Sequence, residues 1–347
     1  MPTFAYPAKP LPGDRVAVLS PSSGAPAVFP DVYELGLRRL RDLLGLVPVE
    51  YPTTRVLGAS AADRARDLHD ALADPGITAI LATIGGDDQI TVLKHLDPEL
   101  VRANPKPFFG YSDSTNLLHY LWRLGIVGYH GGSVMVHLGR PVAAHPLSTA
   151  SLRAALFTSD WYELSAPAEF GDETGHWGDP GVLAVEPAMR PATPWRWEGA
   201  ADRVVEAPTW GGNLEIVSWL AQAGRLGPTG AYAGCACVLE TSEEMPPATE
   251  VYRILRNLGE RGLLAGCPAV LVARAKAWDF ARRLALPDRE AYAEEQRAAV
   301  RRAVAEYAPG ALVVFDLDIG HTDPQLVIPI GGTVRVDGPA KRIWVKY

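Results

Sequence analysis

A serine at the end of a predicted strand is the first residue of this chain that could do chemistry. The segment 110–114 (GYSDS) begins at the end of an apolar run at 107–111 and precedes leucines at helical spacing. On a sharp turn from strand to helix, Ser112 would project its hydroxyl outward, and the amide of the next residue would face a developing oxyanion. Ser and Asp also favour helix N-caps, and the segment lacks the GxSxG pattern. The local sequence therefore leaves a nucleophile and a helix cap both open.

Two adjacent glycines, Gly85 and Gly86, end another apolar run at 77–83. Adjacent glycines allow close backbone approach and free an amide for contact with an anion. A plain turn is an equal alternative, because neither the GxxxxGK[ST] nor the GxGxxG phosphate-binding pattern is present.

A carboxylate and a histidine could complete a hydrolytic site. Glu240 ends the apolar run at 235–240, where a carboxylate could orient a histidine, although acidic clusters such as 240–244 (ETSEE) are also common on surfaces. His321 lies in the segment 319–325 (IGHTDPQ) after an apolar run at 312–316, and a histidine on such a loop can act as a general base. His321 is one of 8 histidines, so its type alone is a weak signal.

Composition restricts the class of protein. Hydrophobic residues form 48% of 347 residues and the formal net charge is −7, with no long basic cluster, so we expect a globular protein without a nucleic-acid partner. No signal-peptide pattern and no long uninterrupted apolar run occurs, which predicts a cytoplasmic protein with no membrane partner. The three cysteines, at 235, 237 and 267, show no metal-binding spacing, so we expect buried thiols and no metal.

The elements that would position these residues alternate between strands and helices. Apolar runs at 14–20, 47–51, 77–83, 107–111 and 126–129 are separated by amphipathic stretches, which predicts a parallel sheet of the Rossmann-like or flavodoxin-like kind. We expect an α/β fold with an N-terminal domain over 1–165, an inter-domain and substrate-binding loop over 166–210, and a smaller C-terminal α/β domain over 211–347. The active site would lie between the domains.

Six segments, in order, resemble the LD-carboxypeptidase family of serine peptidases. They are PSS at 21–23, the stretch 64–86, NPKPFFGYSDST at 104–115, GGNL at 211–214, VLETSEE at 238–244 and GHTDPQ at 320–325. The resemblance implies a triad of Ser112, Glu240 and His321, and an oxyanion hole formed by the amides of Gly86 and Asp113. It also implies substrate contacts from Gly85, Asn213 and Glu243, no cofactor, and a homodimer.

The resemblance covers two branches with different small-molecule substrates. One trims the terminal D-alanine of muropeptides in cell-wall recycling, and the other, the microcin C immunity branch, cleaves the bond that joins an aminoacyl or peptidyl group to a nucleotide. ETSEE, GHTDPQ and a long tryptophan-bearing loop are more similar to the immunity branch, so we expect its antibiotic-detoxifying activity. A muramoyl-tetrapeptide LD-carboxypeptidase is the alternative, and a catalytically idle binding protein is a third hypothesis.

The loop over 166–210 contains tryptophans that could contact a substrate. By resemblance to the immunity branch, Trp177 would stack on the nucleobase of the substrate. Trp195 and Trp197 are alternatives, since they could equally anchor the loop onto the second domain. Trp177 could also be a packing residue, because tryptophan is often buried whatever its function.

Overall fold

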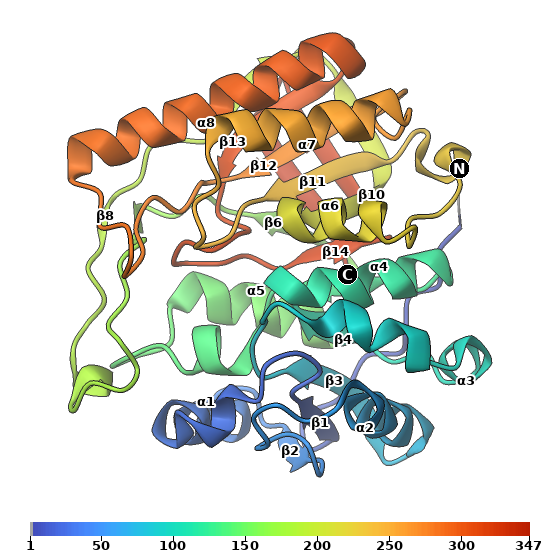
Figure 1. Cartoon of the computed structure of the whole chain (residues 1–347), viewed down its shortest axis with the longest axis vertical. Helices are drawn as coiled ribbons and strands as arrows, with labels where there is room; N and C mark the ends of the chain where they lie inside the picture. The colour runs from blue at the N-terminus through green and yellow to red at the C-terminus, as the bar shows by residue number, and fades with distance from the viewer. Residues whose placement is uncertain (1–2) are drawn as a thin grey trace.

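The computed structural model describes residues 3–347, which form two α/β units placed one above the other (Figure 1). The α/β class and the two-domain architecture expected from the sequence are both confirmed. Within the described residues, no helix combines the length and the apolar character needed to cross a membrane.

The first unit is built on a six-stranded sheet in the order β14-β5-β4-β3-β1-β2. Strands β1 to β5 are parallel, and their order 2-1-3-4-5 is that of the flavodoxin-like fold, as expected. The strands are β1 (Arg15–Leu19), β2 (Val47–Glu50), β3 (Ile77–Ala82), β4 (Phe108–Gly110), β5 (Gly128–His130) and β14 (Ile328–Ile330). The helices are α1 (Pro30–Asp42), α2 (Ala61–Ala73), α3 (Pro98–Ala103), α4 (Thr115–Arg123) and α5 (Pro146–Phe157).

Local sequence signals explain where these elements begin. The oxygen of Ser60 accepts a hydrogen bond from the amide of Asp63 and so caps α2, while Asp97 caps α3 in the same way ahead of Pro98. Strands β3 and β4 are almost entirely buried, as expected for parallel strands that are covered on both faces.

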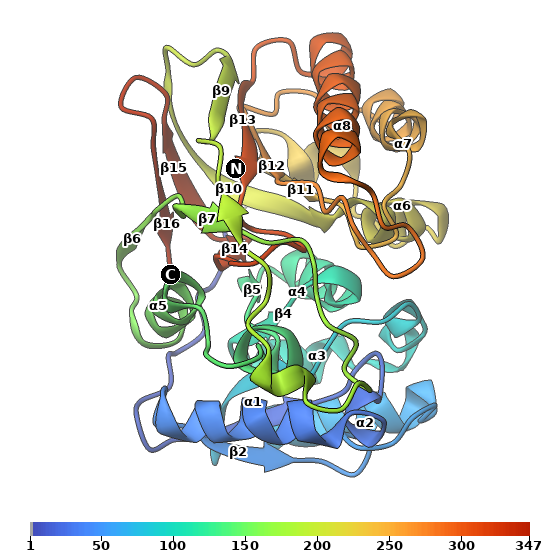
Figure 2. The ribbon, with the colours of Figure 1, turned by 90° about the vertical axis from the view of Figure 1, so that its left-hand side faces the viewer.

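The second unit is built on an eight-stranded sheet in the order β6-β16-β15-β10-β11-β12-β13-β9. Its strands are β6 (Trp161–Leu164), β9 (Arg196–Gly199), β10 (Val204–Asn213), β11 (Ala236–Glu240), β12 (Ala269–Ala273), β13 (Leu312–Leu317), β15 (Thr333–Asp337) and β16 (Arg342–Lys346). Strands β10 to β13 are parallel. Helices α6 (Leu214–Gln222), α7 (Ala248–Glu260) and α8 (Leu286–Tyr307) lie together beside this sheet (Figure 2).

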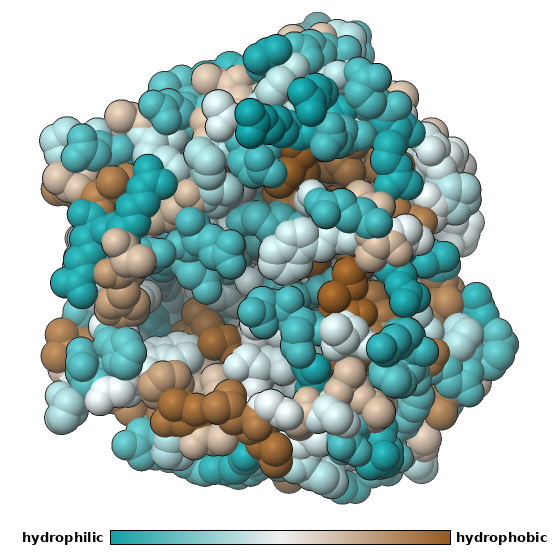
Figure 3. Space-filling model, viewed as in Figure 1, coloured by the Kyte–Doolittle hydropathy of each residue, from teal (hydrophilic) through white to brown (hydrophobic). Residues whose placement is uncertain are grey.

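The two units exchange strands. Strand β14 comes from the C-terminal stretch but pairs with β5 of the first sheet, and β6 follows the helices of the first unit but pairs with β16 of the second. The surface in Figure 3 is largely hydrophilic, and its hydrophobic residues are distributed in separate groups.

The stretch 166–210 is more regular than the sequence suggested. It contains the small hairpin of β7 (Glu169–Phe170) and β8 (Arg190–Pro191), then β9, which pairs with β13, and the first part of β10. Between β7 and β8 the chain descends to the side of the first unit (Figures 1 and 2). Helix α6 starts only at Leu214, because β10 continues to Asn213.

Candidate active site

Ser112 lies in a strained turn between β4 and α4. Its φ is +58°, in the left-handed region that a residue with a side chain adopts only at a cost of roughly 1–3 kcal/mol. Residues Ser112–Ser114 form a single 3-10 turn, and the serine hydroxyl caps no helix. The cap interpretation therefore does not describe Ser112, whose hydroxyl makes no hydrogen bond within the described part of the chain.

The Gly85–Gly86 turn after β3 packs directly against this serine. A Cβ added to Gly85 would lie 3.0 Å from the Ser112 Cβ and 3.2 Å from its Oγ, so a side chain there would crowd the serine. Gly86 has a φ of +156°, and a Cβ there would collide with the hydroxyl of Ser22. The backbone amide nitrogen of Asp113 is 3.3 Å from the same added Cβ of Gly85, so the turn and that amide border one small space beside Ser112.

The side chain of Asp113 fixes this arrangement, a role that the sequence did not predict. Its carboxylate is fully buried and accepts hydrogen bonds from the Ser22 hydroxyl, from the Gln89 amide at 2.9 Å and from the Asn116 side chain at 2.7 Å. Burial raises the pKa of Asp113, while the hydrogen bonds from Ser22 and Gln89 act in the opposite direction. The loop after β1, the glycine turn and the serine turn are thereby joined.

Glu240 and His321 meet at the carboxyl edge of the second sheet. Glu240 is the last residue of β11, and its Oε2 lies 2.5 Å from Nδ1 of His321, in the loop after β13. Both side chains are buried. The ring of Tyr111, the residue before Ser112, is 4.8 Å from the imidazole between centroids, so the His321 ring adjoins the serine turn.

Glu243 contacts the other nitrogen of the His321 imidazole. Its Oε2 lies 3.0 Å from Nε2 of His321, and no hydrogen bond joins His321 to Ser112 among residues 3–347. Burial lowers the pKa of His321, but the carboxylates of Glu240 and Glu243 outweigh burial and raise that pKa to about 10. The histidine is therefore an imidazolium in this arrangement.

Two further histidines and a lysine surround the pair. His130, at the end of β5, has its Nε2 4.0 Å from Oε1 of Glu240, and burial lowers its pKa to about 4. Burial likewise lowers the pKa of His137 to about 3. Lys276, which follows β12, is buried, and burial lowers its pKa while the charge of Glu243 opposes that change. His130 ends a strand and Lys276 follows one closely, which was the available sequence signal, whereas His137 lies in the helical turn Val134–Leu138 and had none.

Asn213 and Trp177 have clear structural partners. Asn213 pairs in register with Glu240, and its side-chain oxygen caps α6 by accepting from the Ile216 amide at 3.0 Å. Its side-chain nitrogen has no partner among the described residues.

The half-buried indole of Trp177 packs edge-on against Phe29, with ring centroids 5.6 Å apart, so it contacts the first unit rather than the triad.

The other two candidate tryptophans anchor the 166–210 stretch to the second unit. The indole of Trp195 donates a 3.0 Å hydrogen bond to Asp318, and Trp197 lies in β9 opposite Val314 of β13. Both contacts agree with the anchoring alternative for these residues.

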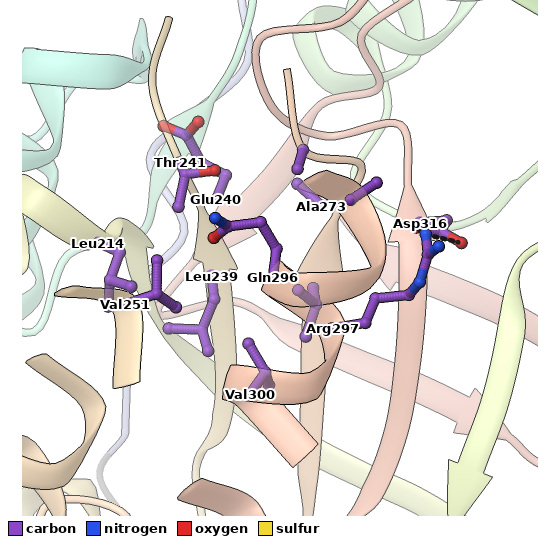
Figure 4. A pocket seen from close by; sticks show the side chains of 13 residues that line it. Leu214, Leu239, Glu240, Thr241, Val251, Ala273, Gln296, Arg297, Val300 and Asp316 are labelled. Atoms are coloured by element: carbon purple, nitrogen blue, oxygen red, sulfur yellow. Dashed lines mark hydrogen bonds and ion pairs between the residues drawn. The ribbon is translucent and has the colours of Figure 1, made fainter. Parts of the chain in front are cut away.

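A small cavity lies behind Glu240, between β11, β12 and α8 (Figure 4). Its lining includes Gln296 and the ion pair between Arg297 and Asp316. The cavity has about 30 Å³ of space for water, whereas a single water needs roughly 10–15 Å³. Ser112 and His321 do not line this cavity, so it is not the place where a substrate would meet the serine.

Two family models match separate parts of the chain. Residues 16–131 match the LD-carboxypeptidase N-terminal domain, and residues 206–336 match the LD-carboxypeptidase C-terminal domain. The chain is 30% identical over 263 residues to the murein tetrapeptide carboxypeptidase of Pseudomonas aeruginosa, covering 73% of this chain and 75% of that protein. It is 24% identical over 292 residues to the microcin C7 self-immunity protein MccF of Escherichia coli, covering 81% of this chain and 77% of MccF.

Solved structures show the same fold. MccF in complex with aspartyl sulfamoyl adenosine superimposes with a TM-score of 0.84 at 22% identity, over 98% of both chains. The two domain matches together cover well over half of the sequence. The chain therefore belongs to the LD-carboxypeptidase family and is a hydrolase of the serine carboxypeptidase type.

Proposed function

We propose that this chain hydrolyses the bond that joins an aminoacyl or peptidyl group to a nucleotide, with Ser112 as nucleophile. The observation that carries the proposal is the juxtaposition of the Glu240–His321 pair with Tyr111, next to the strained serine. A nucleophile, a base and a carboxylate that orients the base are the three parts of a serine hydrolase site.

In the proposed reaction, Oγ of Ser112 attacks the acyl carbon while Nε2 of His321 takes the hydroxyl proton. Glu240 holds Nδ1 and stabilises the imidazolium, and the amides of Gly86 and Asp113 donate to the oxyanion. The imidazolium then protonates the leaving nitrogen, and water hydrolyses the acyl-enzyme with His321 as base. Losing one oxyanion donor in such sites costs about 2.7–4 kcal/mol in the transition state.

Two observations favour a nucleotide-linked substrate. The fold matches MccF over 98% of both chains, and MccF structures contain aspartyl sulfamoyl adenosine and glutamyl sulfamoyl guanosine. The segment between β7 and β8 also brings Trp177 to the first unit, where its half-buried indole could offer a face to a base. The second candidate is a muramoyl-tetrapeptide LD-carboxypeptidase, favoured by the 30% identity to the murein tetrapeptide enzyme.

A parallel assay tests the proposal. The purified protein is incubated separately with aspartyl sulfamoyl adenosine, glutamyl sulfamoyl adenosine and a muramoyl tetrapeptide, and the products are followed by mass spectrometry. We expect release of the free amino acid from at least one sulfamoyl adenosine and little D-alanine from the muropeptide. Release of D-alanine alone would assign the second function instead.

A further inference from the structure

The carboxylate of Glu243 contacts Nε2 of His321, the nitrogen through which this histidine would act as a general base. Nε2 of His321 has to face the Ser112 hydroxyl, because Nδ1 is held by Glu240 at 2.5 Å. In this structure Nε2 faces the carboxylate of Glu243 at 3.0 Å instead. Both nitrogens of the imidazole are thus paired with carboxylates, and the ring cannot take a proton from the serine until Glu243 moves.

The side chain of Glu243 faces solvent as well as His321. It lies in the loop after β11, and 57% of its surface is exposed, whereas Glu240 is fully buried. Burial raises the pKa of Glu243, but the charge of His321 outweighs this and lowers the pKa to about 2, so the group stays a carboxylate. An exposed carboxylate beside the reacting atoms can bind a cation from the substrate.

Three aromatic groups that face His321 supply no competing cation at neutral pH. These are Tyr111 before the serine turn, His130 at the end of β5 and His137 in the helical turn Val134–Leu138. Burial keeps both of these histidines neutral at that pH. Lys276, after β12, faces Glu243, but among residues 3–347 it forms no ion pair with Glu243 or any other carboxylate.

We propose that Glu243 binds the free α-ammonium group of an aminoacyl substrate and that this change of partner releases Nε2 of His321 for Ser112. The inference rests on the proposed function and specifies its substrate class. In an aminoacyl nucleotide the ammonium is two bonds from the scissile carbonyl, which must come within roughly 3–3.5 Å of Ser112. A carboxylate that contacts Nε2 is within reach of that ammonium. In a muropeptide the corresponding amino group is already acylated and offers no cation.

The movement of Glu243 from His321 to the substrate ammonium would also lower the pKa of His321. When Glu243 leaves the imidazole, His321 keeps a single carboxylate, Glu240, and its affinity for a proton falls. A general base works best when its pKa is near the working pH. Substrates with a free ammonium would thus activate the site that hydrolyses them, while substrates without one would meet an imidazolium.

The test compares two substrates that differ only in the amino group, glutamyl sulfamoyl adenosine and its des-amino analogue glutaryl sulfamoyl adenosine. For the wild type we expect kcat/KM at pH 7.5 to be at least about tenfold higher for the glutamyl compound, the effect of one charge-assisted hydrogen bond. In Glu243→Gln this preference should fall to within about threefold, while Glu244→Gln, which removes the same charge one position further along, should keep it.

The pH dependence separates recognition from simple loss of structure. In Glu243→Gln, the rising limb of kcat/KM for the glutaryl compound should move to lower pH, because His321 loses a carboxylate that raises its pKa. Equal hydrolysis of both compounds by the wild type, or an unchanged preference in Glu243→Gln, would overturn the inference and leave the proposed function standing. Hydrolysis of neither compound, nor of aspartyl sulfamoyl adenosine, would overturn both.

Discussion

At the residue scale, His321 is held between two carboxylates, and this pairing links its charge to the stability of the fold. In the unfolded chain a histidine has a pKa near 6.5, whereas here the pKa is about 10. A pKa that is higher in the folded state gives stability that is fully present below pH 6.5. That stability is lost as the pH rises through about 10.

The variant Glu243→Gln tests this linkage. With one carboxylate removed, the folded pKa of His321 should decrease, so the loss of stability between pH 6.5 and 10 should be smaller than in the wild type. Urea denaturation at several pH values measures it, and Glu244→Gln serves as the control. Identical pH dependence in the wild type and Glu243→Gln would show that the Nε2 contact contributes nothing to the fold.

Some of these residues were predictable from sequence and others were not. Ser112, Glu240 and His321 each end or follow a strand, which is a local signal. The contact of Glu243 with Nε2 depends on how two loops distant in sequence meet, and no local pattern encodes it. The side-chain role of Asp113 has the same origin, since its partners come from three separate segments.

At the element scale, the segment between β7 and β8 is attached to both units. Near β7, Asp172 is buried and paired with Arg190 at 2.8 Å and with Arg289 of α8 at 2.7 Å. Further along, Trp177 packs on Phe29 at the start of α1. The segment therefore connects the second unit to the first.

Substitution of Trp177 by Ala tests whether this segment also binds substrate. If the indole stacks on the base, KM for an aminoacyl sulfamoyl adenosine should rise about tenfold, the equivalent of about 1.4 kcal/mol. Activity on a muramoyl tetrapeptide, which has no base, should change much less. Phe29→Ala is the matched control for lost packing, and equal losses on both substrates in Trp177→Ala would indicate a structural role.

The elements were predicted unevenly. Strands β1 to β5 were placed to within one or two residues, because buried parallel strands are short apolar runs between turn residues. The longest helix, α8 (Leu286–Tyr307), was not predicted, because its charged residues are spread around much of the helix and form several ion pairs. Strand β9 is polar and half-buried, and only its pairing with β13 defines it.

At the scale of the whole molecule, the exchanged strands bind the two units together. The amide of Val327, just before β14, donates to the Ser151 hydroxyl of α5 at 2.9 Å, and the Tyr347 hydroxyl donates to the carbonyl of Val327 at 2.7 Å. The chain therefore closes its first sheet with residues from its far end, which no local sequence pattern could indicate.

This arrangement predicts cooperative unfolding. Because neither sheet is complete without strands from the other part of the chain, we expect one transition in urea, with coincident midpoints by far-ultraviolet circular dichroism and tryptophan fluorescence. Trp122 in α4 and Trp210 in β10 are buried reporters, one in each unit. Two separated transitions would indicate units that fold independently.

The most direct test of the whole account is the turnover of Ser112→Ala on the aminoacyl sulfamoyl adenosine that the wild type hydrolyses best. The substitution removes one oxygen and relieves no packing, so circular dichroism and the melting temperature should stay close to the wild type. We expect kcat to fall by about 10⁴-fold or more, as in other serine hydrolases that lose their nucleophile. A folded Ser112→Ala protein that turns over the substrate at a rate near that of the wild type would contradict the assignment of Ser112 as nucleophile.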